Sequence, residues 1–159
     1  MLYPVEIKHA EYNDLEEILN IQKKAFLSEA KIYNDYSFDA LVQSFESIRA
    51  DFNEYTFLKA VVNNEIVGSI KGKMVDTTCW IGRLIVKPEF QNQGIGKLLL
   101  TSIENEFSKA HGYQLFTGSK SLKNIKLYQS AGYTIIDQYP DKTKPDMILI
   151  EMKKENTNQ

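Results

Sequence analysis

Cysteine and histidine are scarce in this chain of 159 residues, which contains one cysteine and two histidines. Cys79 forms no internal disulfide, and no Cys or His partner lies at the spacing of a structural zinc site, so we expect no bound metal. Trp80 and Ile81 follow Cys79, a context that favours a small buried strand residue over a reactive nucleophile. His9 and His111 are isolated in the sequence, which predicts surface or strand-end positions.

Long apolar runs are also missing. No stretch approaches the roughly 20 apolar residues of a membrane span. The first residues, MLYPVEIKHAEYND, lack the basic segment and apolar stretch of a secretory signal. We therefore expect a cytoplasmic protein with no membrane partner. The length and the apolar content of 43% predict one domain over residues 1–153, followed by a polar tail over residues 154–159.

Neither sign of charge dominates, and the net charge is −2. Residues 1–60 carry 11 acidic and 6 basic side chains, whereas residues 61–159 carry 10 acidic and 13 basic ones. This modest basic excess suits a small polyanion, although a solvated mixed surface would explain it as well. Nucleic acid would require a much denser basic stripe, so we expect no nucleic-acid partner.

The first third of the chain predicts a strand followed by two helices. Residues 4–10 alternate in polarity like a strand. Asn13 and Glu16 form a variant capping box, which predicts a helix that runs to about Phe26. Turn-like residues at 34–37 then precede a second amphipathic helix.

The middle of the chain predicts three strands and a long helix. Runs rich in β-forming residues at 55–63 and 65–75 are separated by Asn63 and Asn64, a tight hairpin turn. A third strand, over residues 77–88, ends at a proline. The following helix has an apolar face of Ile95, Leu98, Leu99, Ile103, Phe107 and Ala110, and we expect Gly112 to end it.

The last third predicts a strand at 113–119, a short helix at 121–131, and strands at 133–137 and 147–153. Hairpins require antiparallel pairing, whereas the strand–helix–strand passage around residues 81–118 requires a right-handed parallel crossover. The predicted class is therefore α/β, with a mixed, mostly antiparallel central sheet flanked by helices and a central parallel βαβ crossover. The last strand could pair with a second copy in a homodimer, although an internal position is the plainer interpretation.

Two glycines open the Leu-rich helix in the segment PEFQNQGIGKLLLT. Glycine is costly inside helices, whereas exposed N–H groups at a helix start attract anions, so Gly94 and Gly96 predict a phosphate-bearing ligand. The P-loop pattern fails because position 91 is Gln and position 98 is Leu. The dinucleotide-binding pattern fails because position 99 is Leu and the motif lies past mid-chain.

Gln91, Gly94 and Gly96 follow a strand with the spacing Q-x-x-G-x-G, which resembles the acetyl-CoA signature of the GCN5-related N-acetyltransferase superfamily. Residues 127–136, LYQSAGYTII, are similar to a later family segment of the type L-Y-x-x-x-G-[F/Y], and the order of elements matches from about residue 5 to residue 152. The resemblance implies an acyl-CoA N-acyltransferase fold with acetyl-CoA as co-substrate. Close helix–sheet packing without a ligand is the alternative explanation of the glycines.

The resemblance also implies where the cofactor binds. The main chain of the strand before the glycines would hold the pantetheine arm, a main-chain N–H there would stabilise the oxyanion, and N–H groups at the helix start would bind the pyrophosphate. The implied residues are Leu84, Ile85, Val86, Gln91, Asn92, Gln93, Gly94, Ile95, Gly96, Lys97 and Asn124. Lys97 could equally face solvent. Many family members carry their Asn seven residues before the tyrosine, where this chain has Ser121, so the role of Asn124 stays open.

Tyr128 matches the family position whose hydroxyl commonly protonates the departing thiolate. The alternative is a core tyrosine, because Tyr128 shares a helix face with apolar residues. Many relatives carry a basic Glu on the strand before the glycines, but residues 77–86 contain no carboxylate. Asp76 and Glu89 flank that strand, and a water relay or an amine that binds deprotonated is equally open.

The acceptor pocket of the family lies between the first two helices, where Glu29, Tyr33, Asp35 and Tyr36 fall. Their acidic and aromatic character suits a cationic amine, although it is also typical of a solvated loop. The resemblance implies an acetyl-CoA-dependent N-acetyltransferase that transfers acetyl directly, in a ternary complex, to the primary amine of a small molecule or peptide. The alternative is a non-catalytic acyl-CoA-binding or interaction module on the same fold.

Overall fold

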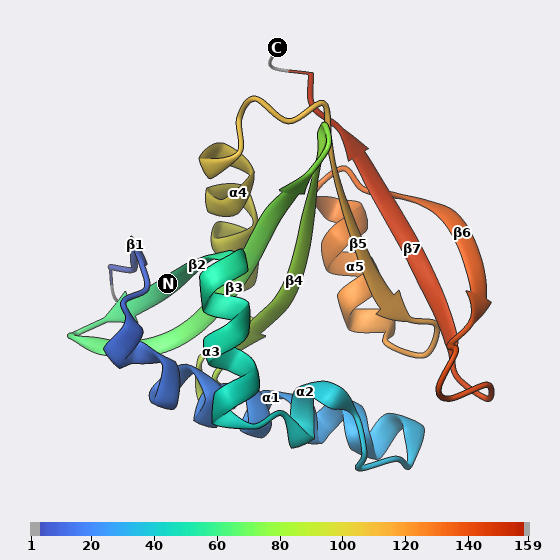
Figure 1. Ribbon diagram of the computed structural model, residues 1–159, viewed down its shortest axis with the longest axis horizontal. Coiled ribbons are helices and arrows are strands. Elements are labelled where there is room, and N and C mark those ends of the chain that lie inside the picture. Colours follow the sequence, from blue (N-terminus) through green and yellow to red (C-terminus); the bar gives the residue numbers. More distant parts are fainter. Residues whose placement is uncertain (1–3, 158–159) are drawn as a thin grey trace.

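A mixed seven-stranded sheet lies at the centre of the structure, with the strand order β1-β2-β3-β4-β5-β7-β6 (Figure 1). The computed structural model describes residues 4–157. The strands are β1 (Glu6–His9), β2 (Thr56–Val62), β3 (Glu65–Val75), β4 (Thr78–Val86), β5 (Gly112–Gly118), β6 (Thr134–Pro140) and β7 (Ile148–Glu155). The helices are α1 (Leu15–Tyr33), α2 (Asp39–Val42), α3 (Phe45–Glu54), α4 (Ile95–Glu106) and α5 (Leu122–Ser130). Among the described strands only β4 and β5 pair in parallel, which confirms the predicted fold class.

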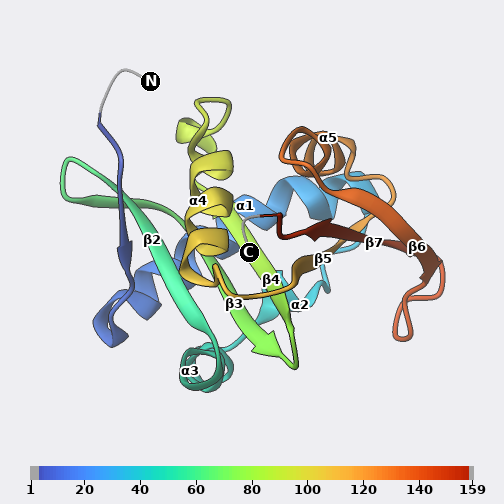
Figure 2. The same ribbon diagram turned by 90° about the horizontal axis from the view of Figure 1, so that it is seen from above.

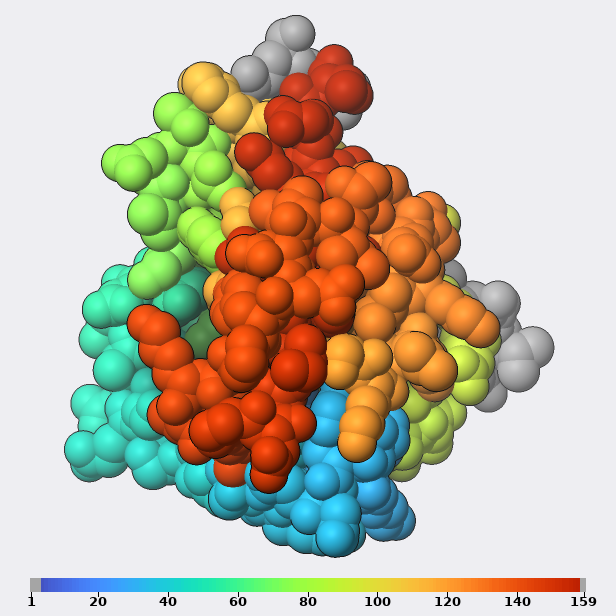
Figure 3. All heavy atoms as spheres, turned by 90° about the vertical axis from the view of Figure 1, so that its right-hand side faces the viewer, coloured from blue at the N-terminus to red at the C-terminus, as the bar shows by residue number. Residues whose placement is uncertain are grey.

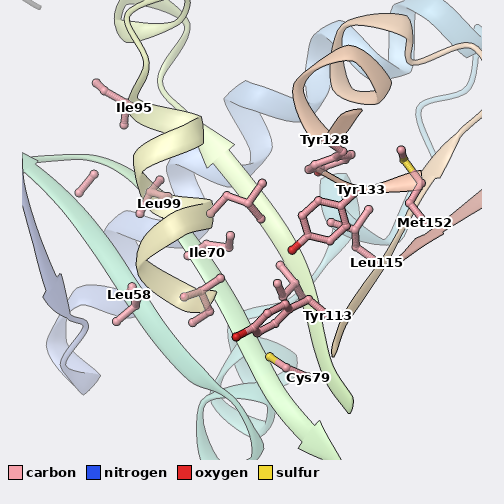
Figure 4. Close-up of a cluster of buried hydrophobic side chains, with 14 of the residues drawn as sticks. Leu58, Ile70, Cys79, Ile95, Leu99, Tyr113, Leu115, Tyr128, Tyr133 and Met152 are labelled. Carbon is pink, nitrogen blue, oxygen red and sulfur yellow. The ribbon is translucent and has the colours of Figure 1, made fainter. Parts of the chain in front are cut away.

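Helices cover both faces of the sheet, because alternate strand residues point to opposite sides. Leu58 and Ala60 of β2 pack into a core with α4, whereas Phe57 packs into a second core with α1 and α3. Figure 2 shows α4 and α3 on opposite sides of the sheet. The first core continues to the C-terminal strands, where Tyr128 and Tyr133 lie next to each other (Figure 4). The helices on the two faces of the sheet therefore belong to two separate hydrophobic cores.

β4 and β5 separate from each other within the sheet. They pair only over Thr78–Trp80 and Gly112–Gln114, and beyond these residues the two strands diverge (Figure 1). On its other side β4 pairs with β3, but the register shifts between Ser69 and Lys71. Opposite this shift, Arg83 has a φ of 51°, the left-handed conformation of a β-bulge. The bulge bends β4 away from β5, since an extra residue increases the local twist of a strand.

The start of α1 corrects one prediction. Asn13 and Glu16 do not form a capping box; instead the N–H of Glu11 donates to Oδ2 of Asp14 at 2.7 Å, around a short 3₁₀ turn. This turn leads directly into α1, which begins one residue before Glu16 and ends only at Tyr33, well beyond the predicted end. Asn34 stops the helix in the left-handed conformation that amide side chains tolerate.

Three more boundaries differ from the predictions. The second predicted helix is split into α2 and α3, because Gln43 is extended between them and Ser44 caps α3 by accepting from the N–H of Ser47 at 3.1 Å. α4 ends at Glu106, and Gly112 instead begins β5, where a Cβ would lie 3.0 Å from the carbonyl of Lys154. β7 runs two residues past the predicted end, and residues 158–159 of the predicted tail lie outside the described residues.

Several local predictions are confirmed. Asn63 and Asn64 form the β2–β3 turn with positive φ angles of 50° and 65°. β7 lies between β5 and β6, so the last strand is internal. Cys79 is fully buried in β4, and burial raises the pKa of its thiol to about 12. His9 and His111 are exposed at strand ends.

Within residues 4–157, none of the helices is both long enough and apolar enough to cross a bilayer. The same part of the chain contains no cluster of three or more His, Cys, Asp or Glu side chains that could hold a metal ion.

Candidate active site

Two cavities adjoin the region where β4 and β5 separate. The larger, of about 540 Å³, is lined by the end of β4, the loop before α4, and the facing sides of α1 and α5; we call it the α4 cavity. The smaller, of about 280 Å³, is lined by α1, α2, the bulge of β4, β5 and residues 141–149; we call it the β5 cavity. Four residues line both cavities: Phe26, Glu29, Leu84 and Asn124. The cavities therefore meet at one shared wall.

The β5 cavity adjoins the C-terminal strands. On the face shown in Figure 3 the surface is hollowed between the teal segment that contains α3 and the orange-red segment that joins β6 to β7. Phe38 and Asp39 line the cavity from the side of α2, and Met147 lines it from the β6–β7 connection. The β5 cavity therefore has an opening to the surface that is separate from the α4 cavity.

The loop before α4 exposes main-chain donors to the α4 cavity. Leu98 makes the first helical hydrogen bond of α4, to the carbonyl of Gly94 at 3.1 Å. The N–H groups of Ile95, Gly96 and Lys97 precede it and have no acceptor among residues 4–157. Unsatisfied donors at a helix start, together with the helix dipole, attract an anion such as a phosphate.

The two glycines serve this loop in different ways. Gly94 has a φ of 85°, and a Cβ at this position would meet no atom within 4 Å. Its missing side chain therefore leaves the cavity open and permits a backbone that other residues rarely adopt. At Gly96 a Cβ would lie 3.4 Å from Cδ2 of Leu127, an ordinary packing distance against α5. Gly96 therefore lines the α4 cavity and also allows α4 to pack closely against Leu127 of α5.

Polar side chains fix the loop and add charge beside it. Nε2 of Gln91 donates to the carbonyl of Val86 at 3.0 Å, which ties the loop to the end of β4. Nζ of Lys123 donates to Oε1 of Gln91 at 3.4 Å, and both Lys123 and the exposed Lys97 line the α4 cavity. Lys123 was absent from the sequence prediction, because a lysine on α5 carries no motif that would connect it to a loop 32 residues earlier.

The predicted cofactor residues are brought together with one exception. The ten that line the α4 cavity are Leu84, Ile85, Val86, Gln91, Asn92, Gly94, Ile95, Gly96, Lys97 and Asn124. Gln93 is exposed and does not line it. The open cradle at Gly94, the unpaired N–H groups and the apolar walls together fit a long ligand with an anionic end and an apolar arm.

Glu29 is the carboxylate at the shared wall. Its Oε1 accepts from Nδ2 of Asn124 at 3.0 Å, and its Oε2 accepts from Oγ of Ser121 at 2.6 Å. The hydroxyl of Tyr33 lies 2.8 Å from the same Ser121 Oγ and accepts from the N–H of Lys120 at 3.0 Å. These contacts join α1 to α5 and hold the carboxylate in place. Asn124 and Ser121, which the sequence offered as alternatives, therefore bind the same group.

Only two of the four residues predicted to shape an acceptor pocket reach a cavity. Glu29 and Tyr33 line the β5 cavity, whereas Asp35 and Tyr36 line neither. Oδ2 of Asp35 accepts from Nζ of Lys144 at 2.8 Å, and this bond, together with those from Ser37, lowers the pKa of the Asp35 carboxyl. Asp35 is thus paired with Lys144, a residue that does line the β5 cavity.

Tyr128 faces the β5 cavity from α5. Its side chain is buried, its ring centroid lies 6.1 Å from that of Tyr133, and its hydroxyl has no hydrogen-bond partner among the described residues. A purely structural tyrosine usually satisfies its hydroxyl when buried. Burial, and secondarily the negative charge of Glu29, raise the pKa of Tyr128, so the phenol stays protonated at neutral pH.

The two carboxylates that flank β4 line neither of the two cavities. Asp76 lies in the exposed β3–β4 turn, Glu89 is exposed, and neither lines a cavity. The carboxylates that do line the β5 cavity are Glu29, Asp39 and Asp141, and the last accepts hydrogen bonds from Thr143 and from the N–H of Lys144. Asp39 was missed because nothing in its local sequence separates it from other surface acids.

Arg83 is the third functional candidate that sequence reasoning missed, after Lys123 and Asp39. It lines the β5 cavity, it sits at the bulge of β4, and burial lowers the pKa of its guanidinium. Its Nε is buried without a hydrogen-bond partner. The available signal was a single arginine in the otherwise uncharged strand TCWIGRLIV, directly after a glycine.

Comparisons with known proteins complete the description. The model of the acetyltransferase (GNAT) family matches residues 15–133. UPF0157 protein YqkA of Bacillus subtilis is 25% identical over 127 residues, which cover 80% of this chain and 36% of that protein, so this chain spans about a third of its length. The spermidine N(1)-acetyltransferase of Thermoplasma acidophilum is 24% identical over 147 residues, which cover 84% of this chain and 90% of that enzyme.

Solved structures share the fold. The PaiA N-acetyltransferase of Thermoplasma acidophilum, solved with coenzyme A, has a TM-score of 0.78 and 22% identity and covers 96% of this chain and 99% of its own. YncA of Salmonella typhimurium, solved with acetyl-CoA, has a TM-score of 0.74 and 23% identity and covers 98% of this chain and 96% of its own. At these identities the likeness concerns the arrangement of helices and strands.

Proposed function

The chain belongs to the acetyltransferase (GNAT) family, and from this premise we propose that it transfers acetyl directly to a primary amine within a ternary complex. The domain is an N-acetyltransferase, and acetyl-CoA is its co-substrate. The proposal concerns the route of transfer, the residues that perform it and the kind of amine that accepts.

One observation carries the proposal: the two cavities meet at a shared wall formed by Phe26, Glu29, Leu84 and Asn124. A donor in the α4 cavity and an acceptor in the β5 cavity would present their reacting groups to each other there. Holding both reactants in one site makes the reaction effectively unimolecular. The buried Cys79 lines neither cavity, so an acetyl-enzyme on the thiol has no support.

The α4 cavity provides for each part of the donor. The N–H groups of Ile95, Gly96 and Lys97 bind its pyrophosphate, with the charges of Lys97 and Lys123 nearby. The main chain of β4 beyond Trp80 binds the pantetheine arm, because β5 no longer pairs with it there. A main-chain N–H in the segment 84–86 polarises the thioester carbonyl and stabilises the oxyanion.

Two side chains transfer protons in the proposed reaction, one as a base and one as an acid. Glu29, held by Asn124 and Ser121, receives the ammonium of the acceptor and takes its proton, since only the neutral amine attacks the thioester. Tyr128, protonated at neutral pH, donates its proton to the departing thiolate of coenzyme A. The named relative that acts on spermidine supports an amine acceptor, as does the carboxylate of Glu29.

The first test is a calorimetric titration of acetyl-CoA into the wild-type protein and a Gly94→Trp variant. We expect the wild type to bind and the variant to lose at least about 100-fold in affinity, because the indole fills the open space over the loop. Gly132→Ala is the control: its φ of 99° makes it equally strained, but it lies outside the α4 cavity, so binding should persist. Equal affinity for the wild type and Gly94→Trp would contradict the assignment of the loop.

A further inference from the structure

Arg83 is a charged group for which residues 4–157 supply no hydrogen-bonding partner. None of its five guanidinium N–H donors has an acceptor, and it makes no ion pair within 4.0 Å among residues 4–157. Its Nε is fully buried. A buried donor without an acceptor is unfavourable, and more so when it carries charge. The rest of the guanidinium must therefore find its acceptors in the space that the protein leaves open.

The carboxylates nearest to Arg83 do not satisfy it. Asp51 favours the charged form of Arg83 from a distance, but its Oδ2 already accepts from Nζ of Lys71 at 2.9 Å and from Nε2 of Gln43 at 2.8 Å. Asp39 lines the same cavity and also favours the charge, yet it forms no ion pair with Arg83. Lys71 adds a second positive charge nearby.

The backbone at Arg83 is strained as well. Its φ of 51° lies in the left-handed region, which residues with a Cβ rarely adopt inside a strand, while the adjacent Gly82 could adopt it without strain. Strained backbone is concentrated at functional sites, where the strained residue positions a group. Here the group lies on the wall of the β5 cavity, one residue before Leu84 of the shared wall.

On the basis of the proposed function, we propose that Arg83 binds a carboxylate of the acceptor, so that the acceptor is an amino acid or a similar amine that carries a carboxylate. Arg83 and Glu29 then present opposite charges to the two ends of a zwitterion within the β5 cavity. The planar guanidinium matches a carboxylate in a two-point interaction. A polyamine supplies no anion and would place a second ammonium near Arg83.

The test compares acceptors that differ only in this carboxylate. L-Leucine, L-methionine and L-phenylalanine are each assayed beside their carboxamides and decarboxylated amines, with spermidine as a further acceptor, through the release of free coenzyme A. We expect kcat/KM for at least one amino acid to exceed that of its carboxamide by about 10- to 100-fold, the range of a charge-assisted hydrogen-bonded pair. The lower basicity of the carboxamide amine works against this preference, so the comparison is conservative.

Arg83→Gln and Arg49→Gln provide the matched variants. Arg83→Gln should reduce the ratio of amino acid to carboxamide to about one, and Arg83→Lys should restore part of it. Arg49 is exposed and lies over the ring of Tyr12, outside both cavities, so its replacement should leave the ratio unchanged. Acetyl-CoA affinity, measured by calorimetry, verifies that each variant is folded.

The outcomes separate this proposal from the proposed function. Turnover of spermidine or the carboxamides at or above that of the amino acids would overturn the role of Arg83 and leave N-acetyl transfer intact. An unchanged ratio in Arg83→Gln would overturn it too. If acetyl-CoA binds but no amine of the panel is acetylated, the small carboxylate-bearing acceptor is wrong, whereas the assignment of the α4 cavity to acetyl-CoA stands.

Discussion

The two cavities differ in the parts of the protein that line them. The α4 cavity is bounded by main-chain donors of a helix start, by an open strand edge and by apolar side chains; apart from Glu29 of the shared wall, its charged side chains are the exposed Lys97 and Lys123 beside the loop. The β5 cavity is bounded by charged side chains from four separate segments, namely Glu29, Asp39, Arg83 and Lys144. One cavity is defined by the path of the backbone, and the other by individual side chains.

This difference teaches which cavity can change easily. A substitution in the α4 cavity leaves N–H groups in place unless it replaces a glycine or distorts the loop. A substitution in the β5 cavity removes or reverses a charge directly. The same framework can therefore keep one donor while its acceptor specificity changes with a few side chains, which agrees with the general rule that fold alone does not determine function.

The largest expected effect is at Tyr128, which lines the β5 cavity. Tyr128→Phe should lower kcat by about 10²- to 10⁴-fold, the range of a general acid, and leave acetyl-CoA affinity within about 3-fold. The reason is that the Tyr128 hydroxyl, on the wall of the β5 cavity, has no hydrogen-bond partner among residues 4–157 to lose. Stopped-flow detection of free coenzyme A measures kcat, and calorimetry measures the affinity.

Tyr133→Phe is the control for this prediction. Tyr133 is also buried beside Tyr128, but its hydroxyl donates to Oε2 of Glu104 at 2.7 Å and it lines neither cavity. Its loss should reduce the free energy of unfolding by about 1–2 kcal/mol and leave kcat unchanged. A Tyr128→Phe enzyme as fast as the wild type would show that Tyr128 is a core residue.

A smaller effect is expected at Glu29. Its replacement should distinguish the reaction of the amine acceptor from the binding of acetyl-CoA. Glu29→Gln keeps the size of the side chain but removes its charge, so kcat/KM for the amine should fall about 10- to 100-fold while acetyl-CoA affinity changes less than about 3-fold. Glu16→Gln, at an exposed site on the same helix, should change neither. Loss of acetyl-CoA affinity equal to the loss of turnover would show that Glu29 serves the donor instead of the acceptor.

The smallest effect should come from Cys79, which lines neither cavity. Cys79→Ala should keep kcat/KM within about 2-fold, and the wild-type thiol should resist alkylation at pH 8 until the protein is unfolded. A fall of 10-fold or more in the kcat/KM of Cys79→Ala would instead show that the buried Cys79 contributes to the reaction.

Cys79 also predicts a pH dependence. Its pKa is raised from about 9 to about 12 in the folded protein, mainly by burial. The stability that the protonated thiol contributes is thus complete below pH 9 and is lost as the pH rises toward 12. The thermal midpoint of the wild type should fall more steeply between pH 9 and pH 11 than that of Cys79→Ala. Parallel curves would contradict the raised pKa.

Sequence reasoning succeeded wherever local chemistry determines the backbone. Asn63 and Asn64 specify a hairpin turn, and Gly94 specifies a left-handed helix start over an open cavity. The order of elements along the chain, the end of β4 and the glycine loop of the α4 cavity were therefore predictable, whereas most of the α1 and α5 residues that line this cavity were not. It erred at boundaries that depend on tertiary contacts. Gly112, for example, begins β5 because the neighbouring strand β7 approaches its α-carbon closely.

The β5 cavity was less predictable because its residues come from distant parts of the chain. Ser121 is 92 residues from Glu29, to which it donates, and Lys144 is 109 residues from Asp35. Nothing in the local sequence of Arg83 indicates that Asp51, whose charge favours the guanidinium, is already bound to Lys71. Such pairings emerge only after the sheet has assembled.

The early end of the β4–β5 pairing has a consequence for aggregation. Beyond Trp80, β4 carries unpaired main-chain groups and is in effect an edge strand in the middle of a sheet. Ordinary edges recruit other chains and promote aggregation, and proteins cover them with charges or bulges. Here α1 and α5 line the α4 cavity beside the free edge of β4, so a further strand would have to pass between these helices to pair with it.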